Sequence, residues 1–361
     1  MTVNTFGIPV VLNRVGGTSE LRYVNGSPLC PWRYRGHWDL YVPVDHTQQA
    51  FEEFCEQAAD VDELAATGRL VVVSGVEGSG KTALIHRCVY ILQRGLAGAL
   101  GVDPDQGAAG DKWALRPPVP GVSVVDLSDE ARRVAYDNKG QLCPLDAINQ
   151  KIFKRVVGDV RKQLSNPAAQ LEELASDTSG ELVDLYQELS DFLCDREHFM
   201  LVILPFVRLG TRQLHVDFLR SYLNFSDRRI VFFAETAEPD VMTSMAPTLS
   251  WEERNLVTHL SIGRLDDADC ESFVRSRMSR PGLPQEHVII APGTLAGVAP
   301  DVHYETVRRL QDSFFQLGEI VRRDGRNEIS GDDFKTLEEQ RRNDPRLLRR
   351  PRPRRGRGSQ G

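Results

Sequence analysis

Short apolar runs alternate along the chain with segments whose apolar residues recur at helical spacing. The runs are rich in β-branched and aromatic residues and are too short for buried helices, so each predicts a buried strand. Strands are predicted over residues 70–73, 122–127, 198–204, 229–234 and 256–265. Strands that alternate with helices indicate a parallel sheet with helices on both faces, so the pattern predicts an α/β fold.

The segments between these runs have the spacing of amphipathic helices. Such helices are predicted to start at Thr47 and to cover 147–160, 182–193 and 216–223. Gly95 follows the apolar positions after the first strand, where we expect it to end a helix in the left-handed conformation. The stretch 97–120 is rich in Gly, Ala, Asp and Pro and is predicted to be a loop.

The pattern becomes purely helical from residue 266. The segment 266–278 has acidic residues in its first turn and basic residues in its last, which suits the helix dipole. Residues 304–321 form a long amphipathic pattern, and a turn at 329–334 leads into one more short helix. We therefore expect a small helical domain over 266–340.

Residues 1–45 precede this pattern, and Gly and Pro divide them into short apolar pieces, which predicts hairpins or irregular structure. The segment 30–45 is dense in aromatic residues and Arg. Aromatic and Arg faces stack on purines, so one interpretation places this segment beside a nucleotide base. The other, which we favour, is an arm over a hydrophobic edge of the core, because aromatic residues pack more often than they bind.

The first predicted strand is followed by GVEGSGKT, residues 75–82, which matches the phosphate-binding loop G-x-x-x-x-G-K-[ST]. Glycines let the backbone approach phosphate oxygens, and the following helix adds its positive N-terminal dipole. Lys81 is expected to reach the β- and γ-phosphates, and the Thr82 hydroxyl to ligate Mg²⁺. A chance Gly-rich turn would lack the strand before and the helix after. The predicted nucleotide contacts are Gly75, Val76, Glu77, Gly78, Ser79, Gly80, Lys81 and Thr82.

The chain has 361 residues, of which 41% are hydrophobic and 26% charged, as is ordinary for a globular protein of about two domains. No apolar run approaches membrane-spanning length, and Met1 does not open a secretory signal. The six cysteines form no C-x-x-C pair, so neither a zinc site nor a disulfide framework is indicated. We expect reduced thiols and a cytoplasmic protein without a membrane partner.

The net charge of −7 is divided unevenly. Residues 341–361 hold nine Arg and one Asp, a charge of +8, while the rest of the chain carries −15. Pro and Gly disfavour a helix there and few apolar residues can be buried, so we expect a disordered tail. Contact with nucleic-acid phosphates is one interpretation of this tail. Docking on an acidic partner or on the acidic body, or a merely solvated extension, are the others.

The order of these parts resembles the AAA+ superfamily of P-loop ATPases and its STAND-like signalling relatives. The resemblance covers residues 46–335, and GVEGSGKT is its specific motif. It implies a P-loop NTPase three-layer sandwich with a parallel central sheet over 46–265, followed by the helical domain as a lid over the nucleotide. The family's third strand usually ends in an acidic pair, the Walker B motif, whereas this strand runs into Pro205, Phe206 and Val207.

Other residues are candidates for the roles that the resemblance implies. Asp126, after the second strand, and Glu235, after the fourth, are candidate substitutes for the Walker B acid. Thr236 is a candidate for the polar sensor that orients water near the γ-phosphate. Arg309, beside Arg308, is a candidate for the lid arginine that contacts the phosphates. The alternatives are solvated carboxylates, a turn-forming Thr and a solvated helix face.

The resemblance implies an ATPase with ATP and Mg²⁺ as cofactors, in which binding and hydrolysis drive lid closure, self-assembly into a homo-oligomer or engagement of a protein partner. Without a Walker B acid, the alternative is a nucleotide-binding switch or scaffold that does not hydrolyse ATP, attached to nucleic acid through the basic tail. A small-molecule kinase shares the P-loop, but the separate helical domain argues against it.

Overall fold

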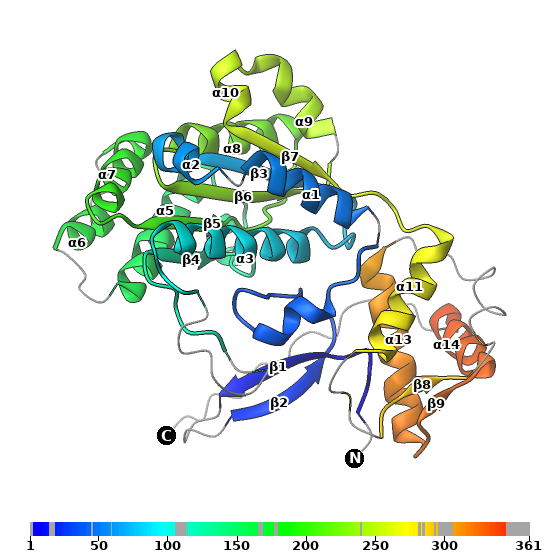
Figure 1. Cartoon of the computed structure of the whole chain (residues 1–361). Coiled ribbons are helices and arrows are strands. Elements are labelled where there is room, and N and C mark those ends of the chain that lie inside the picture. Colours follow the sequence, from blue (N-terminus) through cyan, green and yellow to red (C-terminus); the bar gives the residue numbers. More distant parts are fainter. Residues whose placement is uncertain are drawn as a thin grey trace, which may run out of the picture.

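A five-stranded parallel sheet lies at the centre of the α/β part of the protein (Figure 1). The computed structural model describes residues 3–13, 19–44, 46–58, 60–104, 113, 115–164, 169–176, 180–238, 240–280, 283, 286–291, 294 and 306–343. The strands are β3 (Arg69–Ser74), β4 (Val122–Asp126), β5 (Phe199–Ile203), β6 (Ile230–Thr236) and β7 (Val257–Ser261). Their order is β4-β5-β6-β3-β7, so β3 lies between β6 and β7. All five predicted strands are confirmed.

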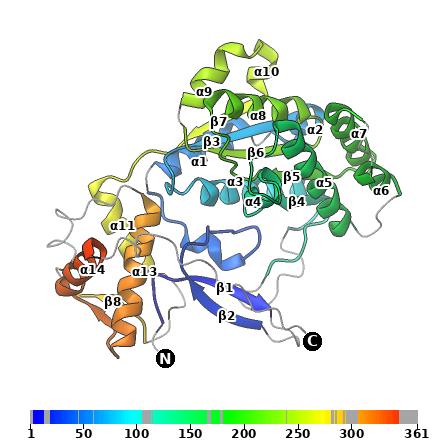
Figure 2. The same cartoon turned by 180° about the vertical axis from the view of Figure 1, so that it is seen from behind.

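Helices cover both faces of this sheet and make the predicted three-layer sandwich, which Figures 1 and 2 show from opposite sides. Residues of β3 alternate between two cores, with Leu70 and Val72 in one and Val71 and Val73 in the other. The first core includes α4 (Ala131–Ala135), α5 (Leu145–Gln163), α6 (Ala169–Ser176), α7 (Leu182–Cys194), α8 (Arg212–Phe225) and α9 (Asp240–Met245). The second core includes α1 (Thr47–Ala58), α2 (Val61–Thr67) and α3 (Lys81–Ala99). The short helices η2 (Ala246–Thr248) and α10 (Trp251–Asn255) lead into β7.

The helix after the P-loop is longer than predicted, because α3 continues past Gly95 to Ala99. Leu96 and Ala97 are fully buried, and their packing carries the helix through the glycine. The left-handed residue is Gly101, with a φ of +71°, so the prediction that Gly95 ends this helix is wrong. The loop predicted over 97–120 is therefore wrong for residues 97–99, which are helical, and its residues 105–112 and 114 lie outside the described residues.

The N-terminal part contains an antiparallel pair of strands, β1 (Ile8–Asn13) and β2 (Ser19–Val24), in which Ile8 pairs with Val24. The prediction of hairpin structure in this part is therefore confirmed. A short 3-10 helix, η1 (Arg35–Leu40), follows.

The aromatic segment 30–45 packs on the helix that follows the P-loop. The guanidinium carbon of Arg87 lies 4.1 Å from the centroid of the Tyr41 ring, and the Arg87 side chain is buried. Trp32 donates its indole N–H to Nδ1 of His86 at 3.0 Å. Because these contacts are all to α3, the structure favours the interpretation of this segment as an arm over the core.

The C-terminal part has a separate core and lies beside the sandwich (Figure 1). Its elements are α11 (Asp267–Met278), β8 (Ile289–Ile290), α13 (Val307–Arg323), β9 (Glu328–Ile329) and α14 (Gly331–Asn343). The N-terminus joins this core, since the rings of Phe6 and Phe314 lie 5.0 Å apart and Asn4 donates Nδ2–H to the Phe315 carbonyl at 2.9 Å. The N-terminal residues therefore belong structurally with the helical part.

The last helix extends into the segment predicted to be a tail. α14 ends at Asn343, so the prediction of a helix-free tail from residue 341 is wrong for its first three residues. Its first turn is acidic, the Ser330 N–H donates to Asp333 Oδ2 at 2.8 Å, and no Pro interrupts the helix before residue 345. Residues 344–361, with most of the predicted Arg-rich tail, lie outside the described residues. The domain limits at residues 45, 265 and 340 remain predictions.

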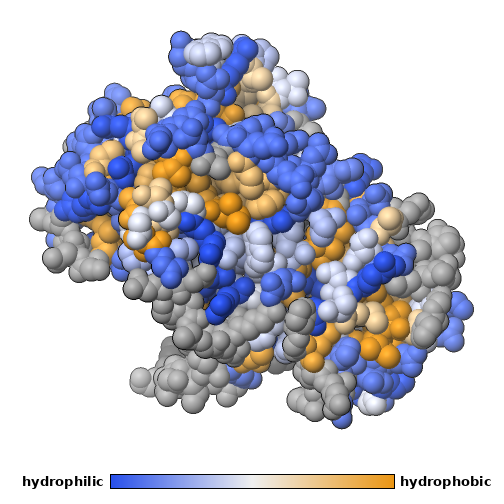
Figure 3. Space-filling model, in the orientation of Figure 1, coloured by the Kyte–Doolittle hydropathy of each residue, from blue (hydrophilic) through white to orange (hydrophobic). Residues whose placement is uncertain are grey.

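The outer surface is mostly hydrophilic on the face shown in Figure 3, with hydrophobic areas over α3 and near α13. Within the described ranges, no helix is both long enough and apolar enough to cross a membrane.

Candidate nucleotide-binding site

The predicted phosphate-binding loop connects β3 to α3 at the carboxyl edge of the sheet. Gly78 and Gly80 have φ angles of +88° and +99°, which residues with a Cβ rarely adopt. Lys81 begins α3, and its Nζ donates to the Gly75 and Val76 carbonyls at 2.9 Å each. The loop therefore curls around the Lys81 ammonium group, as the motif predicts.

A cavity of about 620 Å³ opens above this loop, a volume in the range of ligand-binding pockets. Its walls come from four parts of the chain. The P-loop side supplies Glu77, Gly78 and residues 80–83. The strand ends and the loops after them supply Ser128, Asp129, Phe206, Arg208 and Glu235. The N-terminal part supplies Ile8 and residues 26–29, and the helical part supplies Arg277, Val307, Arg308, Gln311 and Asp312.

Glu235 is the acidic candidate that reaches the P-loop. Strand β6 pairs with β3, and Val73 lies opposite Glu235 in the register. Glu235 Oε2 accepts a hydrogen bond from Thr82 Oγ1 at 3.0 Å. Burial raises the pKa of Glu235, and the nearby Lys81 charge opposes that rise. Burial likewise lowers the pKa of Lys81, and the Glu235 charge opposes that fall.

The position where a Walker B acid is expected carries an aromatic ring. Phe206 follows β5 and lines the cavity, with its ring centroid 6.0 Å from Lys81 Nζ. Asp126, at the end of β4, is absent from the described lining and instead accepts hydrogen bonds from the N–H and Oγ–H of Ser128, at 3.1 and 2.7 Å. The carboxylate that contacts the predicted Mg²⁺ ligand Thr82 is therefore that of Glu235, from the neighbouring strand.

Thr236 makes local contacts rather than facing the cavity. Its hydroxyl accepts from the Glu238 N–H at 3.2 Å, and its carbonyl accepts from the Gly75 N–H at 3.2 Å. The side chain is buried and is not among the described lining residues. The structure thus favours the turn-forming interpretation of Thr236 over the sensor role.

The helical part docks directly on the P-loop. The Arg308 N–H donates to the Gly78 carbonyl at 3.0 Å, at the first turn of α13. Glu77 lies between two arginines, 2.6 Å from Arg208 Nη2 and 3.4 Å from Arg308 Nη1. Two positive side chains are therefore held beside the phosphate-binding loop.

Of the adjacent lid arginines, Arg308 lines the cavity, whereas Arg309, which we selected from the sequence, does not appear in its described lining. The position of the first residue of α13 explains why Arg308 and not Arg309 lines the cavity. Thr306 caps α13 by accepting from the Arg309 N–H at 3.3 Å, and this orientation turns Arg308 toward Gly78.

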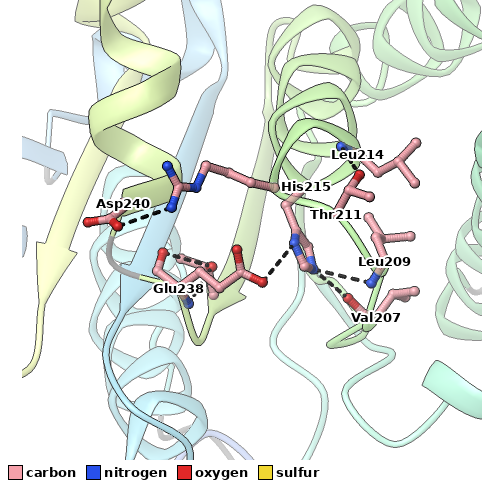
Figure 4. Close-up of polar contacts among 9 residues, drawn as sticks. Val207, Leu209, Thr211, Leu214, His215, Glu238 and Asp240 are labelled. Atoms are coloured by element: carbon pink, nitrogen blue, oxygen red, sulfur yellow. Dashed lines mark hydrogen bonds and ion pairs between the residues drawn. The ribbon is translucent and has the colours of Figure 1, made fainter.

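His215 joins the loops that follow β5 and β6 (Figure 4). Its Nδ1 lies 3.4 Å from Glu238 Oε1, and its Nε2 accepts from the Leu209 N–H at 3.3 Å. His215 thus connects the loop that carries Arg208 with the residue two positions after the end of β6.

Several lining residues were not found from the sequence. Arg208 stands four positions after the third predicted strand, and a basic residue so close to a strand end is a signal that could have identified it. Arg277 and the N-terminal residues Ile8 and 26–29 carry no motif, and only the packing of the helical part brings them to the cavity.

The sheet and the loop together define a P-loop nucleotide-binding fold. Among solved structures, the chain is similar to the ORC2 protein of Aeropyrum pernix in its ADPNP–ADP complexes, with a TM-score of 0.52 and 16% identity over 81% of this chain and 67% of that one. The ADP form of the same protein matches with a TM-score of 0.50 and 14% identity, over 83% of this chain and 69% of that one. Cdc6p of Pyrobaculum aerophilum matches with a TM-score of 0.48 and 13% identity, over 83% and 69% of the two chains. The chain therefore shares the fold of the two ORC2 structures, a parallel sheet between helical layers with a helical part after it.

No family model matches the sequence, and a search of curated proteins found no match.

Proposed function

We propose that this protein is an AAA+-like ATPase that binds Mg-ATP in the cavity between the sheet and the helical part. The observation that carries the proposal is the arrangement of Lys81 inside the P-loop with Thr82 bonded to Glu235 at 3.0 Å. An ammonium group, a hydroxyl group and a carboxylate thus meet where a nucleotide's terminal phosphates would lie. The similarity to an ORC2 protein in complexes with ADPNP and ADP supports a nucleotide as the ligand.

In this proposal the P-loop exchanges its internal contacts for contacts to phosphate. Lys81 leaves the Gly75 and Val76 carbonyls and donates to the β- and γ-phosphates, and the N-terminus of α3 adds its positive end. Arg308 approaches the phosphates from the helical part. These groups stabilise negative charge at the terminal phosphate, which is most of what a phosphoryl-transfer site must do.

The residues also fit Mg²⁺, which prefers oxygen ligands. Thr82 supplies a hydroxyl oxygen and Glu235 a carboxylate oxygen close to it. No group of three or more His, Cys, Asp and Glu side chains in the described part of the chain could hold a metal by itself, which is compatible with an ion held mainly by phosphates and water. When bound, the ion would neutralise charge on the β- and γ-phosphates. Glu235 would anchor its shell through Thr82 and accept a hydrogen bond from the attacking water.

The proposed output is a change in the helical part, leading to self-assembly or to engagement of a protein partner. The contact from Arg308 to Gly78 and the ion pair from Arg308 to Glu77 connect the two parts at the phosphate end. A γ-phosphate there would compete with Glu77 for the arginine. The six cysteines are free thiols, which supports a reducing compartment such as the cytoplasm.

ATP binding and phosphate release should be measured on the wild type, Lys81→Ala and Glu235→Gln. We expect Lys81→Ala to lose binding, and Glu235→Gln to bind ATP while turnover falls by about 100-fold or more. Asp126→Asn is the matched control and should leave turnover unchanged. Binding without phosphate release by the wild type would favour the alternative, a non-hydrolysing switch. The absence of any binding would contradict the proposal.

A second candidate function is attachment to nucleic acid through the C-terminal tail. It rests on the nine Arg and single Asp of residues 341–361, beside a body that carries −15. Such contacts would be sequence-independent and would weaken steeply with salt. Deletion of 344–361 should abolish binding to a DNA duplex at low salt, and unchanged affinity would remove this candidate.

A further inference from the structure

One lining residue of the cavity is a buried guanidinium that the phosphate chemistry does not use. Arg277, in the last turn of α11, is only 4% exposed. Its Nε and Nη1 have no hydrogen-bond partner among the residues that the structure describes. Buried charged groups are nearly always paired, because an unpaired buried donor is costly. A group of this kind in a cavity wall indicates a ligand that supplies hydrogen-bond acceptors.

Arg277 faces the N-terminal wall of the cavity. Burial lowers the pKa of His37 to about 4, and the Arg277 charge contributes to that shift. His37 in turn contacts the Pro9 carbonyl at 2.7 Å and accepts from the Cys30 N–H at 2.9 Å. Arg277 and Ile8 line the same cavity, and Arg280 donates to the Gly7 carbonyl at 3.3 Å, so the chain at the end of α11 lies beside the start of β1.

The phosphate end has a different set of charges. The charged groups that shift the pKa of Lys81, after burial itself, are Glu235, Arg308 and Glu77. Arg277 is not among them. The cavity is thus lined by the P-loop charges and, from the helical part, by the separate guanidinium of Arg277.

The wall beside that guanidinium is apolar. Ile8 and Leu29 are buried together and pack against Ala83, the residue after the P-loop threonine. Val307, from the first turn of α13, also lines the cavity. Apolar walls with a few placed polar groups are the usual surroundings of a flat, uncharged ligand group such as a nucleobase.

We propose that Arg277 recognises the base of a purine nucleotide by donating hydrogen bonds to acceptor atoms on the base edge. The inference rests on the proposed function and adds base specificity to it. Both purines offer the acceptor N7. Guanine offers O6 beside N7, whereas adenine has an amino donor in that place, so a donor-only guanidinium gains more from guanine. The site accommodates ATP and GTP, and Arg277 shifts the selectivity toward GTP.

The test compares three probes on the wild type and on Arg277→Met: ATP, GTP and inorganic tripolyphosphate, which has no base. We expect GTP affinity to fall by about tenfold or more, ATP affinity to fall less, and tripolyphosphate affinity to stay unchanged. Arg280→Met is the matched control, because Arg280 is also buried and on the same part of the chain but donates to the Gly7 carbonyl at 3.3 Å. It should leave the affinity for all three probes unchanged.

Arg277→Lys keeps the charge and loses the planar fork, so it tests the same point should the Met variant not fold. It should lower the ratio of GTP to ATP affinity. Equal losses for tripolyphosphate and the nucleotides would make Arg277 a phosphate contact, and an unchanged ratio in both variants would make it structural; either result overturns the inference. If the wild type binds tripolyphosphate and both nucleotides equally, base recognition is absent while the P-loop proposal stands. If it binds none of them, both proposals fail.

Discussion

The contact between the helical part and the P-loop can be tested by replacing one glycine of the loop, Gly78, with alanine. We predict that Gly78→Ala destabilises the nucleotide-free protein by loosening this contact. A Cβ on Gly78 would lie 3.1 Å from Arg308 Cβ and 3.2 Å from Thr306 Oγ1. Both distances are shorter than ordinary van der Waals contact. Arg308 cannot retreat easily, because its N–H is bonded to the Gly78 carbonyl at 3.0 Å.

Two effects add at this position. The φ of +88° disfavours any residue with a Cβ, which costs about 1–2 kcal/mol. Displacing packed neighbours costs about 1–3 kcal/mol more. For a cooperative unfolding of all 361 residues, 1 kcal/mol corresponds to roughly 1 °C in Tm, so the expected loss is several degrees.

Gly80→Ala separates the two effects. Its φ is +99°, but a Cβ there would meet no atom within 4 Å. It should therefore show the conformational cost alone, and the free energy of unfolding should differ between the variants by about 1–3 kcal/mol. Thermal and denaturant unfolding of both variants without nucleotide measure this difference. Equal destabilisation of the two would refute the reasoning, because it would show that the helical part does not rest on Gly78 in solution.

Three further predictions concern the charges around the P-loop. Glu77→Gln should change stability little, because the ion pairs of Glu77 are exposed, but should raise ATP affinity about threefold at low salt by removing a negative charge beside the phosphates. Titrations at two salt concentrations check this, and a gain that does not shrink with salt would count against it. Because burial raises the pKa of Glu235 above its ordinary value of 4.5 and lowers that of Lys81 below 10.5, the pH range of full turnover should be narrower than the ordinary values imply. By linkage, the stability that Glu235 contributes below pH 4.5 is lost as pH rises through its raised pKa, so Glu235→Gln should gain stability relative to the wild type over that interval; parallel stability curves for the two proteins would contradict this.

The sheet and the P-loop were predictable because their signals are local. Each strand is a short apolar run bounded by turn residues, and all five runs form strands in the structure. Lys81 and Thr82 follow from a motif whose spacing is set by the loop itself. Helix ends were less predictable, since the burial of Leu96 outweighed the conformational preference of Gly95.

The choice between the acidic candidates was not predictable, because it depends on which strands are neighbours. Asp126 and Glu235 both end a strand, and the sequence alone does not say which strand adjoins β3. In the structure β6 does, and the register places Glu235 opposite Val73, within reach of Thr82. The strand that carries Asp126 lies at the edge, with β5 and β6 between it and β3. The order of the strands in the sheet therefore decides between the two carboxylates, which the residue types alone do not distinguish.

The N-terminal residues connect α13 to the wall of the cavity, and this connection matters for the proposed function. Asn4 donates to the Phe315 carbonyl at 2.9 Å, Gln311 donates to the Phe6 carbonyl, and both acceptor and donor residues on the helical side belong to α13. Residues 8–13 continue directly from this junction into the hairpin, and residues 26–29 after it line the cavity. Any movement of α13 that follows loss of the Arg308 contact must therefore also move the start of the hairpin. A nucleotide that changes the helical part would thereby change the wall of its own cavity, so that lid position and ligand affinity are coupled through the N-terminus.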